Sequence, residues 1–220
     1  MKALMFGSIG SLIETSELQR RAFNLAFEDH GLDWYWDNKD YRAMLSESGG
    51  NLRIKAYAEL NSQEVDASAI HKTKSQHFNK FLKSKSLCLR KGVLKSLQFA
   101  RDNNFKTAFV STTLKSTIQS IMEVEHEALK GLFSLVISED EKFRPKPAPE
   151  AYLAVCKILN VLPEDVLAVE DNPAGLASAR SAGVNVIAYL GENTQHCDVS
   201  LARWVAGEDI FPVVVEALDA

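Results

Sequence analysis

The sequence lacks several features that would place it in a specialised class of proteins. Its three cysteines, Cys88, Cys156 and Cys197, are far apart and odd in number. This excludes a disulfide framework and a metal-ligand spacing, and it favours a reducing compartment. No apolar run approaches the length of a membrane span, and the N-terminus has no apolar stretch of the signal-peptide kind. We therefore expect a cytoplasmic protein with no membrane partner.

A strong charge of one sign is also missing. The 220 residues carry a formal net charge of −4, so electrostatics offers no reason to expect nucleic acid as a partner. A hydrophobic content of 46% and a charged content of 25% are ordinary for a globular protein. The length is sufficient to bury a substantial core. The sequence leaves the oligomeric state open, with a monomer favoured.

Proline is absent from residues 14–85, and this stretch has a helical pattern. The apolar spacing predicts helices near residues 16–30, 41–45, 51–60 and 64–83. Gly31 is expected to end the first of them. Trp34 and Trp36, in the following connection, are interpreted as packing residues rather than as a ligand platform. The candidates for the inner side of the last helix are Ile70, His77, Phe78, Phe81 and Leu82.

After residue 87 short apolar strands alternate with helices. The strand candidates are 107–110, 134–137, 166–169 and 184–188, and the helix candidates are 93–103, 115–124, 149–159 and 174–182. This alternation predicts right-handed βαβ units and a parallel sheet covered on both faces. The apolar strand near the N-terminus must join the same sheet, since alone it has no partner. We expect an α/β protein whose doubly wound, Rossmann-like core comprises residues 1–13 and 88–220, with an inserted all-helical cap domain at residues 14–87.

Unusual side chains follow the strands, at the carboxyl edge where active sites of parallel sheets form. Ser111 and Thr112 place hydroxyls at an expected helix N-terminus, which favours a phosphate but alone is more typical of an ordinary N-cap. Lys146 has prolines on both sides, which stiffen its loop. A cation on a stiffened loop is expected where the protein binds an anion. Glu170 and Asp171 could cap a helix, or they could bind magnesium together with a substrate phosphate.

In this order the segments resemble the haloacid dehalogenase superfamily, and most closely its β-phosphoglucomutase-like branch with the CbbY-type sugar phosphate phosphatases. The resemblance covers essentially the whole chain, and residues 146–152 and 169–176 match specific motifs of the branch. It implies that Ser111 and Thr112 bind phosphate and that Lys146 neutralises it. It also implies that residues 170–171 are the family's acidic pair.

Within that pair the resemblance makes Asp171 the stronger magnesium ligand, helped by Glu170. In the helical insertion, Gly50 and Arg53 match a Gly-x-x-Arg loop through which the cap meets the substrate. Gln19 stands where the branch often has histidine.

The chain departs from the family at its first motif. The family has Phe-Asp-x-Asp-Gly-Thr-Leu, and this chain has Phe-Gly-Ser-Ile-Gly-Ser-Leu at residues 6–12. Gly7 replaces the aspartate that attacks phosphorus, and Ile9 replaces the aspartate that acts as general acid/base. Glycine has no atom that could form the aspartyl-phosphate intermediate. No intact catalytic residue is therefore predicted, and the magnesium site is expected to be weak or lost.

Three hypotheses follow for function. The first is a catalytically impaired member of the family, a pseudoenzyme that still binds a small phosphorylated or anionic ligand such as a sugar phosphate, inorganic phosphate or sulfate. The second is a weakly active magnesium-dependent phosphatase acting on a sugar phosphate. The third is a non-enzymatic interaction protein with a vestigial pocket. For the first, an anion is expected to contact Lys146 and Ser111, with Arg53 closing from the cap. The alternative is that residues 170–171 pair with Lys146 and leave a water-filled cleft.

Overall fold

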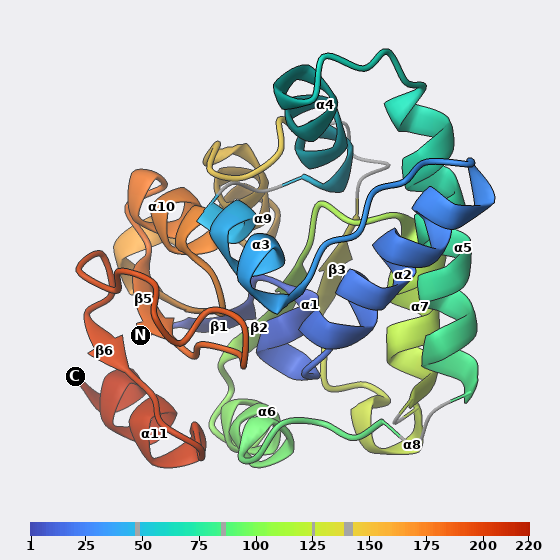
Figure 1. Ribbon diagram of the computed structural model, residues 1–220. Coiled ribbons are helices and arrows are strands. Elements are labelled where there is room, and N and C mark those ends of the chain that lie inside the picture. The colour runs from blue at the N-terminus through green and yellow to red at the C-terminus, as the bar shows by residue number, and fades with distance from the viewer. Residues whose placement is uncertain (47–48, 85–86, 125, 139–142) are drawn as a thin grey trace.

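The computed structural model describes residues 1–46, 49–84, 87–124, 126–138 and 143–220 (Figure 1). Its centre is a six-stranded sheet in the order β3-β2-β1-β4-β5-β6, in which all neighbouring strands are parallel. The strands are β1 (Ala3–Phe6), β2 (Lys106–Val110), β3 (Leu135–Ile137), β4 (Val166–Glu170), β5 (Asn185–Ala188) and β6 (Trp204–Val205). The predicted parallel α/β sheet, with the N-terminal strand inside it, is confirmed.

The two central strands are apolar on both faces. Every residue of β1 and β4 is buried, as expected for parallel strands that are covered by helices on two sides. Phe6 and Phe109 are register partners on one face, whereas Met5 and Ala108 are partners on the other. The first pair belongs to one apolar cluster and the second pair to another. The two-residue periodicity of the strands thus divides the core into two layers.

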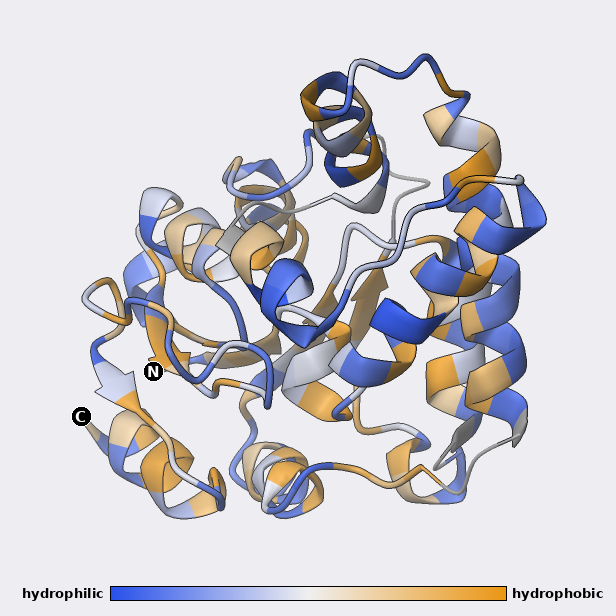
Figure 2. Cartoon of the chain, viewed as in Figure 1, coloured by the Kyte–Doolittle hydropathy of each residue, from blue (hydrophilic) through white to orange (hydrophobic). Residues whose placement is uncertain are grey.

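Helices cover both layers. Helices α6 (Val93–Asp102), α7 (Lys115–Val124) and α11 (Phe211–Asp219) contribute to the first cluster, and α9 (Glu150–Leu159) and α10 (Pro173–Ser181) to the second. A short helix, α8 (His126–Leu129), precedes β3. Figure 2 shows apolar residues along the strands and mixed polar and apolar residues on the surrounding helices. None of the helices in the described ranges has both the length and the apolar character needed to cross a membrane.

In the described residues, four α-helices lie between β1 and α6, after the short helix α1 (Ile9–Leu12), and we call them the cap helices. They are α2 (Ser16–Asp29), α3 (Asn38–Ala43), α4 (Gly50–Leu60) and α5 (Ala67–Ser84). They share an apolar cluster rich in aromatic side chains. Trp34 and Trp36 are buried in it, which confirms that they are packing residues. A domain division at residues 14 and 87 remains a prediction, and α5 also packs against α7 (Figure 1).

Several local features differ from the sequence-based expectations. Helix α5 begins at Ala67 rather than near residue 64, because the carboxylate of Asp66 accepts hydrogen bonds from the backbone N–H groups of Ser68 and Ala69. Strand β6 and helix α11 were not predicted, and β6 is only two residues long. Of the candidates for the inner side of α5, Ile70, Phe78 and Leu82 are buried, whereas His77 and Phe81 are only partly buried.

Candidate ligand-binding site

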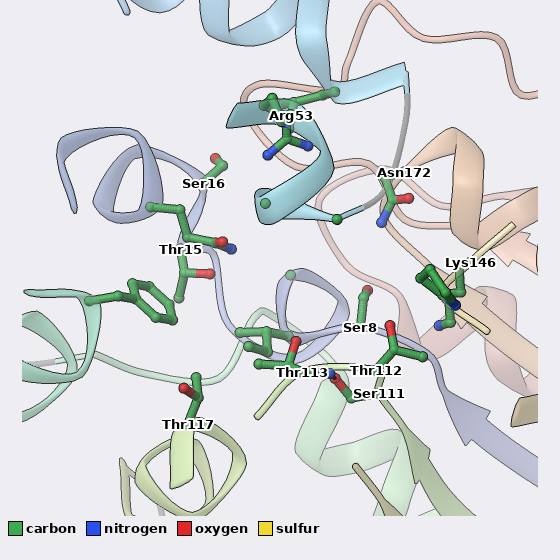
Figure 3. Close-up of a pocket in the computed structure, with 18 of the residues that line it drawn as sticks. Ser8, Thr15, Ser16, Arg53, Ser111, Thr112, Thr113, Thr117, Lys146 and Asn172 are labelled. Carbon is green, nitrogen blue, oxygen red and sulfur yellow. Dashed lines mark hydrogen bonds between the residues drawn. The ribbon is translucent and has the colours of Figure 1, made fainter. Parts of the chain in front are cut away.

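A cavity of about 530 Å³ lies between the carboxyl ends of the central strands and the cap helices. It is placed where ligands bind in open α/β sheets. Figure 3 shows Arg53 reaching toward it from α4, with Ser8, Ser111 and Thr112 on the opposite side. All of the predicted site residues except Glu170 line it: Gly7, Ile9, Gly50, Arg53, Ser111, Thr112, Lys146 and Asp171. The fold therefore brings together residues that are up to 164 positions apart, from Gly7 to Asp171.

The space beside Gly7 is already filled. A Cβ atom added at Gly7 would lie within 3.0 Å of the Tyr152 hydroxyl and of the Glu170 carboxylate. Both of these side chains are completely buried. The missing side chain at residue 7 has therefore left no vacancy, because Glu170 and Tyr152 occupy the room where a side chain would begin.

Lys146, which lines the cavity, and Glu170, which lies behind it, form a buried ion pair. The Lys146 ammonium donates to Oε1 of Glu170 at 2.6 Å, to the backbone carbonyl of Val110 at 3.1 Å, and to that of Gly7. The Tyr152 hydroxyl donates to the same Oε1 of Glu170 at 2.6 Å. An ammonium group has three N–H donors, and here protein atoms accept all three. Oε2 of Glu170 is buried without a hydrogen-bond partner.

Burial raises the pKa of Glu170, although the adjacent Lys146 opposes this shift. Of the two arrangements expected from the sequence, the structure has the one in which Lys146 pairs with an acid. The acid is Glu170 alone, since Asp171 makes different contacts. The predicted contact between Lys146 and a bound anion remains a prediction, and it would require Lys146 to exchange one of its present acceptors for the anion.

Asp171 turns toward the loop after β1. Its Oδ1 accepts hydrogen bonds from the Ser8 hydroxyl at 2.7 Å and from the Asn172 amide at 2.6 Å. A Cβ atom added at Gly10 would lie within 3.0 Å of Oδ2, so glycine at residue 10 makes room for this carboxylate. Asn172 also caps α10, because its side chain accepts from the backbone N–H of Gly175 at 2.9 Å.

The acidic pair offers a magnesium ion one uncommitted carboxylate, that of Asp171. Magnesium takes oxygen ligands in near-octahedral geometry and usually relies on one or two protein carboxylates. Glu170 is committed to Lys146 and Tyr152, and Asp171 is the one remaining acid of the pair, with Oδ1 already accepting two hydrogen bonds. Within the described ranges, no cluster of three or more His, Cys, Asp or Glu side chains could hold a metal ion.

Ser111 belongs to a turn rather than to a helix cap. Helix α7 begins only at Lys115, and the Ser111 hydroxyl accepts from the backbone N–H of Thr113 at 3.2 Å. The predicted helix at 115–124 is confirmed, and residues 111–113 lie in the connection that precedes it rather than at its cap. Ser111 and Thr112 nevertheless line the cavity, where they supply hydroxyl groups.

The cap helices carry positive charge to the other side of the cavity. Arg53 donates from Nε to the Met44 carbonyl at 2.9 Å, and its guanidinium carbon lies 5.6 Å from the centre of the Tyr41 ring. Gly50 starts the same helix, and a Cβ atom there would lie within 3.0 Å of the His71 ring. Gly50 thus allows α4 to approach α5 closely.

Lys74 is a cavity residue that sequence reasoning missed. Its ammonium donates to the Gln19 side-chain oxygen at 3.0 Å and lies 4.9 Å from the ring centres of both Phe23 and Phe78. The side chain is buried, and within the described ranges no carboxylate pairs with it. Helix α5 contains several lysines, so nothing in the local sequence distinguishes the one that faces inward.

Lys74 makes the stability of the protein depend on pH. Burial, reinforced by the charge of Arg53, lowers the pKa of Lys74 from 10.5 to about 7. Between these two values the unfolded chain binds a proton that the folded chain does not, so the free energy of unfolding rises with pH. The slope from this group is at most about 1.4 kcal/mol per pH unit.

We expect the substitution Lys74→Met to remove this rise in denaturant unfolding curves recorded across the alkaline range. Lys72→Met is the matched control, because Lys72 lies on the same helix but is exposed. A rise that is equally steep in the wild type and in Lys74→Met would contradict the prediction.

Comparisons with known proteins assign the family. The sequence model described as haloacid dehalogenase-like hydrolase matches residues 10–189. Protein CbbY of Rhodobacter capsulatus is 36% identical over 208 residues, covering 93% of this chain and 92% of that protein. The crystal structure of CbbY from Rhodobacter sphaeroides in complex with phosphate has a TM-score of 0.89 at 28% identity and covers 100% of both chains.

A mutant of the same CbbY, crystallised with xylulose-(1,5)bisphosphate, has a TM-score of 0.85 at 29% identity and covers 94% of this chain and 93% of that one. Sequence and fold thus agree on the family and on the branch within it. The chain belongs to the haloacid dehalogenase-like hydrolases, and within them to the CbbY type of sugar-phosphate phosphatase.

Proposed function

We propose that this chain binds a phosphorylated sugar in the cavity above the strand ends but does not hydrolyse it. The observation that carries the proposal is the filled space beside Gly7. The resemblance to the family places the attacking aspartate at this position, and here the Glu170 carboxylate and the Tyr152 hydroxyl occupy the room for a side chain. The chain therefore lacks the nucleophile, and a side chain at residue 7 would have to displace the Glu170 carboxylate and the Tyr152 hydroxyl.

The chemistry of the family requires a carboxylate at this point. Hydrolysis proceeds through a covalent intermediate on the nucleophile, and Gly7 cannot form one. The position of the general acid/base is taken by Ile9, whose side chain packs into an apolar cluster of the core. Loss of the acid/base alone would cost a factor of about 10²–10⁴ in rate.

Ligand binding is supported by features that do not depend on the first motif. The cavity is lined by hydroxyl groups from several loops and by cationic side chains from α4 and α5. Similar CbbY proteins have been crystallised with phosphate and with xylulose-(1,5)bisphosphate. A pocket of this size and chemistry is suited to a small sugar phosphate.

Three measurements test the proposal. Phosphate release from a panel of sugar phosphates, with magnesium added, is expected to be negligible, and acid-quenched protein is expected to carry no aspartyl-phosphate. A magnesium-dependent rate of about 1 s⁻¹ or more, typical of working enzymes, would instead favour an active phosphatase. Calorimetry in excess chelator is expected to detect sugar-phosphate binding without metal. Absence of binding would favour an interaction protein with a vestigial pocket.

A further inference from the structure

The loop after β1 places a serine hydroxyl against an aspartate at the strand ends of the cavity. Ser8 follows Gly7 directly and lines the cavity, on the same side as Thr112 (Figure 3). Its hydroxyl donates to Oδ1 of Asp171 at 2.7 Å, across 163 positions of the chain. A serine hydroxyl is a weak nucleophile unless an adjacent base takes its proton. The fold therefore supplies Ser8 with a base that its neighbours in the sequence do not provide.

Asp171 is held in position for this contact. The Asn172 amide donates to the same Oδ1 at 2.6 Å, which fixes the carboxylate beside the Ser8 hydroxyl. Lys146 pairs with Glu170, and within the described ranges no cation forms an ion pair with Asp171. The Asp171 carboxylate is therefore able to accept the proton of the Ser8 hydroxyl.

A second serine of the cavity makes a similar contact but has a different surrounding. The Ser16 hydroxyl donates to Oε1 of Glu14 at 2.5 Å, and the backbone N–H of Ser16 donates to the same oxygen at 2.9 Å. The other oxygen of Glu14 accepts from the backbone N–H of Glu192 at 2.9 Å, so Glu14 fixes the start of α2 against the loop after β5. Among the described residues that line the cavity, Ser8 is the one hydroxyl whose carboxylate partner holds no backbone N–H group.

We propose that Ser8 is a phosphorylation site, which takes the phosphoryl group of a bound sugar phosphate with Asp171 as the base. The bond from Ser8 Oγ to phosphorus forms as the bond from phosphorus to the sugar oxygen breaks. The Ser8 proton passes to Asp171 and from there to the sugar oxygen, so the products are phosphoserine and the free sugar. Protein kinases pair an aspartate with the accepting hydroxyl in the same way.

This inference rests on the proposed function, because the donor has to bind in the cavity. Each chain reacts once, since the Ser8 hydroxyl is consumed, and the transfer therefore adds no hydrolytic turnover. The product is a phosphate ester of serine, which is chemically distinct from the aspartyl-phosphate of the family.

The test incubates the protein with ribose 5-phosphate in excess chelator and locates phosphate by mass spectrometry of its peptides. Ribose 5-phosphate and phosphoserine are both esters of primary alcohols, so an excess of the probe drives the transfer forward. We expect phosphoserine at residue 8 in the wild type and none there in Ser8→Ala. Asp171→Asn should slow the labelling by about 10²–10⁴-fold, the usual contribution of a general base.

Calorimetry separates this loss from a structural defect. Asp171→Asn should bind ribose 5-phosphate at least as tightly as the wild type, because the substitution removes a negative charge from the cavity. Ser16→Ala is the matched control, since it removes the other hydroxyl that donates to a carboxylate in the cavity, and it should leave the labelling of Ser8 in place.

Three results would overturn the inference while the proposed function stands: binding of ribose 5-phosphate without any label, label only on another residue, or Asp171→Asn labelled as fast as the wild type. Phosphate release in repeated turnovers, or no detectable binding of ribose 5-phosphate, would instead contradict the proposed function and the single transfer with it.

Discussion

Gly7→Asp is expected to destabilise the protein by about 3 kcal/mol or more, although it restores the residue that the family uses as its nucleophile. The new Cβ atom would come within 3.0 Å of the Tyr152 hydroxyl and the Glu170 carboxylate. The new charge would also be buried beside Glu170, whose only cationic partner among the described residues is Lys146. Two adjacent carboxylates sharing one ammonium group are strongly unfavourable in a buried site. Chemical denaturation in excess chelator measures the loss.

Gly7→Asn is the matched control, because asparagine has the same shape without the charge. Gly7→Asn should therefore show only the steric part of the destabilisation, about 1–3 kcal/mol, as for other overpacked core sites. Millimolar magnesium should recover stability in the aspartate variant and not in the asparagine variant, since a cation offsets only charge. An aspartate variant as stable as the wild type would show that the space beside Gly7 is not filled in solution.

The second large effect is expected at Lys146. Lys146→Met should cost about 3–5 kcal/mol, because it leaves the buried Glu170 carboxylate without its counter-charge. The matched control is Lys2→Met, which breaks the ion pair with Asp165 at the surface. An exposed pair of this kind is worth about 0–1 kcal/mol. Urea or guanidinium unfolding of both variants under the same conditions gives the comparison.

A double substitution separates the stability lost through the unpaired charge from the stability lost through changed packing. Adding Glu170→Gln to Lys146→Met removes the orphaned charge, so the double variant should be more stable than Lys146→Met alone. The cost of Lys146→Met should also shrink as the pH falls, because burial already raises the pKa of Glu170 and a protonated acid needs no counter-charge. Equal costs for Lys146→Met and Lys2→Met would mean that the buried pair contributes no more than a surface one.

Several parts of the protein could be predicted from local sequence alone. The strands β1 and β4 are short apolar runs next to turn residues, and their alternation with helices implies a parallel sheet. Gly31 ends α2 with a positive φ of 66°, as its position after the apolar pattern indicated. The identity of residues 7 and 9 is itself a sequence fact. Such features depend on neighbours in the chain, and a sequence contains that information directly.

Other parts were decided by contacts between distant residues. The sequence places Glu170 and Asp171 side by side, yet one is buried against Lys146 and the other faces Ser8. Which of the two acids is buried depends on the space beside Gly7. Gly7 is 139 positions from Lys146 in the chain, yet its carbonyl accepts a hydrogen bond from the Lys146 ammonium. Lys74 became a site residue only because α5 turns that one lysine toward the cavity. The fold and the missing carboxylates could thus be predicted from the residues alone. Packing decided which charges are neutralised inside the protein and which face the cavity, because burial and pairing arise only when the chain is folded.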